Sequence, residues 1–244
     1  MGLTKSLLLG AVVSACALQA VQAQPPSELL DLAARVHYGY YHGDARAIEA
    51  AEAALDRLPD SPDVLYYRDF AALRRVQLGG AARTGLLRLD ECARRKIATG
   101  LPKPFTAEAW ILVAACALLA GDERRREEAL ALARSRDDDN PRIVLVEAWA
   151  LERAAQDDRA QSEAWAAKLA AAVEAFDATT PTIDDPDWGH AEALTALAAH
   201  ALDRGQVRMA RDLLERALML VPEYQTAVDL RVALQSGARG NRTL

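Results

Sequence analysis

The chain has 244 residues, enough for one domain or for one continuous array of repeats. Apolar residues make up 51% of it and aromatic residues 5%, with alanine and leucine predominating, which favours closely packed helices over a β-rich core. The formal net charge is −6 and no long basic tract is present, so the composition argues against a nucleic acid as partner.

The N-terminus resembles an export signal. Lys5 supplies a short positive segment, and the apolar run over residues 7–18 is too short to span a bilayer. Val21 and Ala23 then place small residues at the alternate positions that signal peptidase requires. This pattern predicts a signal peptide over residues 1–23 and a periplasmic or secreted protein.

A second interpretation of the same region stays open. Residues 13–16, Val-Ser-Ala-Cys, resemble a bacterial lipobox, in which Cys16 is lipidated and becomes the new N-terminus. The protein would then be anchored at a bacterial membrane by lipid alone, because no other stretch is apolar for long enough to span one.

Five prolines recur at intervals of about 40 residues and divide the remaining chain into helical hairpins. They are Pro59, Pro102, Pro141, Pro181 and Pro222. Each lies just beyond an apolar pattern of helical period, which proline can end but cannot continue. The sequence therefore predicts a helical-repeat domain over residues 24–236, built from about five hairpins.

The first two hairpins are expected over residues 27–59 and 63–102. In the first, Gly43 makes the turn and Asp44 is suited to cap the second helix. In the second, Gly79 and Gly80 make the turn and the second helix covers residues 84–98. Asp69 departs from the pattern, because it occupies a position where a small residue is expected at the helix crossing.

The third and fourth hairpins are less regular. Thr106, a good N-cap residue, is expected to open the third, which turns at Gly121. The fourth covers residues 142–181 and has no glycine at its turn, and its second helix is expected over 162–178. Residues 179–187 form the least helical stretch of the chain.

The last hairpin, residues 188–222, has the clearest pattern. Gly205 closes its first helix and Pro222 ends its second. Small residues and leucines recur at steps of three and four along both helices, at Leu194, Leu197, Ala198, Ala201, Ala210, Leu214 and Ala217. A capping helix is expected over residues 225–235 and a disordered tail over 237–244.

These positions resemble the tetratricopeptide repeat, with leucine where that family often has tryptophan. The match is specific within residues 188–222 and looser elsewhere. The resemblance implies an all-α fold, a right-handed superhelix of about five tetratricopeptide-like hairpins plus the C-terminal capping helix. It also implies the usual role of the family, which is to present a concave groove to a partner polypeptide.

If the first helix of each hairpin lines the inner surface, as the resemblance implies, helical phase selects a set of candidate groove residues. They are Glu108, Ile111, Glu192, Thr195 and Asp203. Tyr38 and Tyr41 share one helical face and are candidates for the groove wall, with ordinary core packing as the alternative. Together with Asp31 the carboxylates make part of the groove acidic, which favours a basic or mixed partner.

Export also affects the interpretation of Cys92 and Cys116. The two residues lie on different predicted helices, and adjacent repeat helices pack together, so a disulfide between them is one expectation. Two buried reduced thiols that act as small apolar side chains are the alternative.

The sequence contains no motif for catalysis, for a metal or for a cofactor. Its four histidines have no HExxH spacing, no GxSxG elbow positions a nucleophile, and no glycine-rich loop follows a strand. Residues 137–139, three aspartates, lack the ligand spacing of a calcium loop and are interpreted as a solvated turn. The sequence therefore predicts a protein that is not an enzyme and needs no cofactor.

Two functions remain open. The first is a non-catalytic scaffold, periplasmic or membrane-anchored, that binds a protein or peptide partner of the cell envelope through a concave groove. The alternative is an accessory subunit of a periplasmic solute-uptake system that encloses a small apolar ligand. An open groove would favour the scaffold, and an enclosed cavity of several hundred cubic ångströms would favour the ligand binder.

Overall fold

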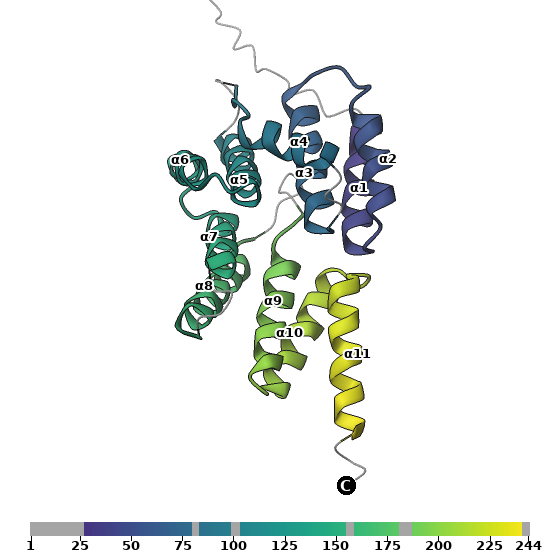
Figure 1. The fold of residues 1–244 in the computed structure, drawn as a ribbon, viewed down its shortest axis with the longest axis vertical. Coiled ribbons are helices and arrows are strands. Elements are labelled where there is room, and N and C mark those ends of the chain that lie inside the picture. Colours follow the sequence, from purple (N-terminus) through teal and green to yellow (C-terminus); the bar gives the residue numbers. More distant parts are fainter. Residues whose placement is uncertain (1–26, 80–82, 99–102, 155–158, 181–186, 241–244) are drawn as a thin grey trace, which may run out of the picture.

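The computed structural model describes residues 27–79, 83–98, 103–154, 159–180 and 187–240 (Figure 1). These residues form eleven helices and no strand. The helices are α1 (Ser27–Tyr41), α2 (Ala45–Leu55), α3 (Pro62–Gln77), α4 (Arg83–Ala93), α5 (Lys103–Ala120), α6 (Glu123–Arg134), α7 (Pro141–Ala154), α8 (Arg159–Ala178), α9 (His190–Asp203), α10 (Val207–Leu220) and α11 (Gln225–Gly240).

Consecutive helices pair into five hairpins, α1–α2, α3–α4, α5–α6, α7–α8 and α9–α10, and α11 covers the last one. The first helices α1, α3, α5 and α7 pack on one another in order, while the second helix of each hairpin packs on the first helix of the next. Figure 1 shows the array curving until α9 and α10 lie below α1 and α3. The predicted all-α repeat architecture, tetratricopeptide-like hairpins with a terminal capping helix, is confirmed.

Helix ends agree with the expected proline breaks where the structure describes them. Pro59 lies between α2 and α3, and Pro222 lies between α10 and α11. Pro141 also marks a break, but as the first residue of α7, where a missing N–H costs no helical hydrogen bond. Pro102 and Pro181 lie outside the described residues.

Four predicted helix boundaries are wrong by three residues or more, and one of them is the start of α8 at Arg159 rather than at residue 162. Thr106 does not open α5, because the helix starts three residues earlier with Pro104 in its first turn. The second helix of the second hairpin ends at Ala93 rather than at residue 98, since Arg125 donates hydrogen bonds to the carbonyls of Ala93 and Arg95 there. Helix α11 continues to Gly240, past the expected end at residue 235.

The glycine turns occur where the sequence predicts them. Gly43, Gly79, Gly121 and Gly205 each follow the first helix of a hairpin with φ between 69° and 79°, the left-handed region in which glycine has no steric penalty. Asp44 caps α2 as expected, and its carboxylate accepts hydrogen bonds from the backbone N–H groups of residues 46 and 47.

The crossing of α9 and α10 is built from small residues. Ala198, Ala201, Ala210 and Ala217 are buried, and Leu214 fills the space beside them. Small side chains let the two helix backbones approach, so burial at these positions is the physical basis of the repeat pattern in the sequence. The helical phase deduced for this hairpin is correct.

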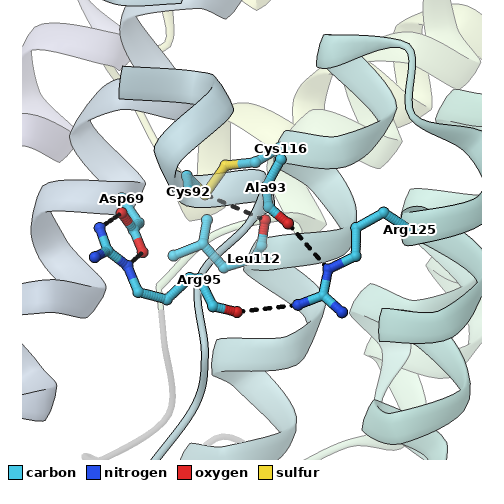
Figure 2. The surroundings of a disulfide bond; sticks show 7 residues. All are labelled: Asp69, Cys92, Ala93, Arg95, Leu112, Cys116 and Arg125. Atoms are coloured by element: carbon cyan, nitrogen blue, oxygen red, sulfur yellow. Dashed lines mark hydrogen bonds and ion pairs between the residues drawn. A yellow bond between two sulfur atoms is a disulfide. The ribbon is translucent and has the colours of Figure 1, made fainter. Parts of the chain in front are cut away.

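A disulfide joins α4 to α5 in the middle of the array (Figure 2). The Cys92 and Cys116 sulfurs are 2.07 Å apart, their Cα atoms are separated by 5.9 Å, and both side chains are fully buried. Figure 2 also shows Arg95, just after α4, reaching back to Asp69 on α3, with Arg95 Nη2 2.5 Å from Asp69 Oδ1. The bond and the ion pair together hold the short helix α4 between its neighbours.

Candidate functional site

The first helices of the hairpins send their side chains to a common centre. This central cluster combines aromatic rings with buried charges from widely separated parts of the chain. Its members are Tyr40, Tyr41, Tyr66, Phe70, Arg74, Glu108, Arg142, Trp149, Trp188, Glu192 and Tyr224. Most of these residues lie on the first helices of the hairpins, whereas Trp188 precedes α9 and Tyr224 lies between α10 and α11.

Arg74 on α3 is the most deeply buried charge in the cluster, with no solvent-exposed surface. Its guanidinium carbon lies 4.0 Å from the centre of the Tyr40 ring and 5.3 Å from that of Trp188, distances typical of cation–π contacts. Its Nη1 donates to Gln77 at 2.8 Å, and its Nη2 donates to Glu192 at 2.5 Å. The charge is therefore paired, as a buried charge must be.

Glu192 performs two tasks at the start of α9. Its Oε2 accepts a hydrogen bond from the backbone N–H of Gly189 at 2.8 Å, which caps the helix. Its Oε1 receives Arg74, and the Tyr41 hydroxyl lies 3.4 Å from Oε2. One carboxylate thus links the last hairpin to α1 and α3, more than a hundred residues away.

Trp188 fills the space between α3 and α7, and only 3% of its surface is exposed. Its indole N–H donates to the Tyr66 hydroxyl at 3.3 Å, and its carbonyl accepts from Arg142 Nε at 2.9 Å. The rings of Phe70 and Trp149 both lie 6.1 Å from the Trp188 ring, centre to centre. The indole is therefore enclosed by aromatic rings and oriented by one hydrogen bond, while a second hydrogen bond holds the backbone carbonyl of the same residue.

Gly189 lets the chain pass from Trp188 into α9. It has a φ of +105°, and a Cβ atom at this position would lie 2.7 Å from the Phe176 ring. Both the backbone conformation and the space around it therefore require glycine.

Glu108 and Arg142 form a second buried ion pair in the cluster, between α5 and α7. Arg142 Nη1 lies 3.2 Å from Glu108 Oε1, which also accepts a hydrogen bond from the Asn140 amide at 2.7 Å. Two of the carboxylates that the sequence assigns to the groove, Glu108 and Glu192, are therefore paired with arginines of the same chain.

The tyrosines around Arg74 stay protonated. Burial raises the pKa of Tyr41 well above its usual value, and the negative charge of Glu192 raises it further. Burial alone would lower the pKa of Arg74, but Glu192, Tyr40 and Tyr41 outweigh this effect and leave it raised. The centre consequently holds a charged pair among neutral rings.

His37 on α1 lies beside this pair, with its ring 4.8 Å from that of Phe70. Burial, followed by the positive charges of Arg74 and Arg142, lowers its pKa to about 3. Its Nδ1 is buried and has no hydrogen-bond partner. The imidazole is therefore neutral at physiological pH.

The predicted groove residues divide into two groups. Tyr41, Glu108, Ile111, Glu192 and Thr195 are buried, whereas Tyr38 and Asp203 are exposed. The buried five are closed off from solvent in the free protein. The assignment of all seven residues to a binding groove stays a prediction.

A second group of charges lies between α2, α3 and α4. Arg75 Nη1 is 2.8 Å from Glu52 Oε2, and both side chains are buried. Asp69, which departed from the repeat pattern, accepts two hydrogen bonds from Arg95. An ion pair thus occupies the crossing at which the other hairpins have a small residue.

Two hollows are the best formed on the described surface. One, of about 930 Å³, is open to solvent and runs along the start of α10 beside Val207, Met209, Arg208 and Arg211. The other has about 10 Å³ and lies among the charges between α2 and α4. Neither is an enclosed apolar cavity of the size that a small ligand requires.

Within the part of the chain that the structure describes, no three His, Cys, Asp or Glu side chains group in a way that could hold a metal ion. No helix in the same part of the chain is both long and apolar enough to cross a lipid bilayer. The predicted signal peptide and Cys16 lie outside the described residues.

Sequence reasoning missed Arg74, Arg142 and the role of Trp188. One signal was available, because Arg74 follows Phe70 by four residues and therefore lies on an apolar helical face. A charge on such a face predicts a buried partner. Nothing in the spacing identifies Glu192 as that partner, since the two residues are 118 positions apart.

No family model and no curated protein matches the sequence. Among solved structures, the fold is similar to the crystal structure of a thermophilic TPR protein from the bacterium Thermus thermophilus. The TM-score is 0.48 and the sequence identity 20%, and the alignment covers 86% of this chain and 97% of the other.

Proposed function

We propose that the protein is a non-catalytic scaffold of the bacterial cell envelope whose inner face binds a protein or peptide partner. The observation that carries this proposal is that the inner face already holds a peptide segment, residues 187–192, through the side chains of Trp188 and Glu192 and through two backbone carbonyls. Trp188 and Glu192 are enclosed by residues of α1, α3 and α7. A surface that selects two side chains of one segment has the chemistry needed to select a partner.

The solute-uptake alternative has less support. It requires an enclosed apolar cavity, and the two best-formed hollows are an open depression and a small gap among charges. We therefore favour a polypeptide over a small apolar molecule as the ligand.

The proposal places the protein outside the cytoplasm, with Cys16 as the alternative point of attachment to a membrane. The mass of the protein purified from its native envelope tests this point. Cleavage after Ala23 leaves an N-terminus at Gln24, whereas lipoprotein processing leaves a lipidated Cys16. An uncleaved chain recovered from the cytoplasm would contradict export.

Partner binding is tested with the tagged full-length chain, cross-linked in native envelopes and followed by purification of whatever is joined to it. The purified partner should then bind the wild-type protein with a measurable Kd and bind a Trp188→Ala variant with an altered one. A Met219→Ser variant serves as the control, because Met219 is exposed on the outer helix α10. Equal affinity for all three proteins would exclude the inner face as the binding surface.

A further inference from the structure

We infer that the inner face is a recognition site for an acidic peptide that carries an aromatic side chain followed four residues later by a carboxylate. In the free protein, Trp188 and Glu192 of the chain itself fill this site. The inference rests on the proposed function and adds the chemistry of the partner to it.

The site and its occupant come from different parts of the chain. Its walls are Tyr41 on α1, Tyr66, Phe70 and Arg74 on α3, and Arg142 and Trp149 on α7. The occupant is one short segment, of which Trp188 and Glu192 make the side-chain contacts with these walls. Gly189 and Ala191 are buried as well, but the side-chain hydrogen bonds from the segment to these walls come from positions 188 and 192.

The charge of the walls determines the sign of the charge that the bound peptide must carry. Arg142 retains Glu108 on α5 whether or not the segment is in place, because Glu108 belongs to the walls. Arg74 loses its carboxylate when Glu192 leaves, and its Nε already has no hydrogen-bond partner. A peptide that buries Arg74 again must therefore supply an anion, because a basic peptide would leave that charge buried and unpaired.

The preference of the site for an aromatic side chain follows from the rings and the hydroxyl group that line it. The wall rings and the Tyr66 hydroxyl surround a flat apolar group with one N–H donor. Tryptophan satisfies both features, whereas an aliphatic side chain would leave the hydroxyl without this donor. The four-residue spacing to the carboxylate is the spacing at which the chain's own segment reaches Arg74.

Occupation of the site by its own segment reduces the affinity for any competitor. The apparent affinity equals the intrinsic affinity multiplied by the fraction of molecules in which the site is open. A substitution that weakens the hold on the segment should therefore strengthen binding of a peptide added in trans.

The probe is a fluorescein-labelled peptide with the sequence of residues 187–194, and its Kd is measured by fluorescence anisotropy. We expect Glu192→Gln and Trp188→Ala proteins to bind it at least about tenfold more tightly than the wild type does, because the open fraction rises. Peptides in which the tryptophan is alanine, or the glutamate glutamine, should bind these variants at least about tenfold more weakly, as expected when a buried partner is lost.

The matched control variants are Trp165→Ala and Glu163→Gln, which change the same residue types on α8, away from the central cluster. They should bind the peptide with the affinity of the wild type. The inference is overturned if the Glu192→Gln protein binds no more tightly than the wild type, or if the altered peptides bind as well as the unaltered one.

Circular dichroism establishes that each variant is folded. Should Trp188→Ala fail to fold, Glu192→Gln carries the test, because glutamine preserves the size of the side chain. Hydrogen exchange gives a second measurement on the wild type, in which saturating peptide should accelerate exchange of the amides of residues 189–193. Unchanged exchange in the presence of bound peptide would also overturn the inference.

Failure of this inference is distinguishable from failure of the proposed function. A purified envelope partner that binds at the inner face while the peptide does not bind would remove the aromatic and carboxylate specificity and leave the scaffold role intact. Absence of binding by both would remove both proposals.

Discussion

The crossing of α9 and α10 and the central cluster are both buried, yet they are built on opposite principles. The crossing uses alanines and leucines from two helices that are adjacent in sequence. The central cluster uses arginines, carboxylates and aromatic rings from helices that are far apart in sequence. Apolar crossings stabilise each hairpin locally, whereas the paired charges decide how the last hairpin meets the first two.

The largest loss of stability should follow removal of one member of the buried ion pair between Arg74 and Glu192. Glu192→Ala leaves Arg74 buried without its anion, and we expect the free energy of unfolding in urea to fall by about 3–5 kcal/mol. The control is Glu163→Ala, which removes an ion pair with Arg204 in which both side chains are in contact with solvent. We expect this variant to lose less than about 1 kcal/mol of unfolding free energy. A loss no greater than that of the control would contradict a closed centre.

Removal of the disulfide measures how strongly a covalent bond stabilises the first half of the array, for comparison with the charges at the centre. Cys92 and Cys116 are 24 residues apart, and closing a loop of that length stabilises a fold by about 3 kcal/mol. A Cys92→Ala/Cys116→Ala protein should lose about that much in urea unfolding. Thiol titration of the unfolded wild type should find two additional thiols after reduction; an equal count before and after would show that the bond is absent.

The apolar crossing should respond to added volume rather than to lost charge. Ala210→Leu and Ala217→Leu insert methylene groups where the backbones of α9 and α10 approach, with an expected cost of roughly 1–3 kcal/mol each. Arg211→Leu adds a leucine to the exposed side of α10 and should change the stability by less than about 0.5 kcal/mol. Unchanged melting temperatures for both Ala210→Leu and Ala217→Leu would mean that α9 and α10 do not cross at these two positions.

The last prediction concerns pH. His37 has its folded pKa lowered from 6.5 to about 3, so between these values the unfolded chain binds the proton and the folded protein does not. Stability should therefore fall as the pH is lowered below 6.5, with this histidine contributing a slope of up to about 1.4 kcal/mol per pH unit. A His37→Gln protein should show a shallower decline between pH 6.5 and pH 4 in urea unfolding. Identical slopes would indicate that the ring is solvated.

Much of the fold followed from local rules. The glycine turns, the Asp44 cap and the phase of Ala210 and Ala217 depend on neighbours within a few residues, and the periodicity of the sequence records such neighbours. The start of α5 did not follow, because Pro104 suits the first turn of a helix as well as the end of one. The end of α4 was set by Arg125, a residue of another hairpin.

The site was only half predictable. Helical phase, a local property, selected Glu108 and Ile111, and both are buried. Whether such a residue lines a groove depends on tertiary packing, such as that of Trp188 against α3 and α7. A carboxylate near an inner face resembles a ligand contact until its arginine is identified, and that pairing is a property of the tertiary fold.

A double-mutant cycle on Arg74 and Glu192 tests the central claim most directly. The free energy of unfolding is measured for the wild type, Arg74→Met, Glu192→Met and the double variant. If the two charges are paired, the double variant should lose less unfolding free energy than the two single variants lose together. We expect this coupling energy to be at least about 2 kcal/mol. Losses that add to within about 0.5 kcal/mol would show that the two residues do not meet and that the array does not close on itself.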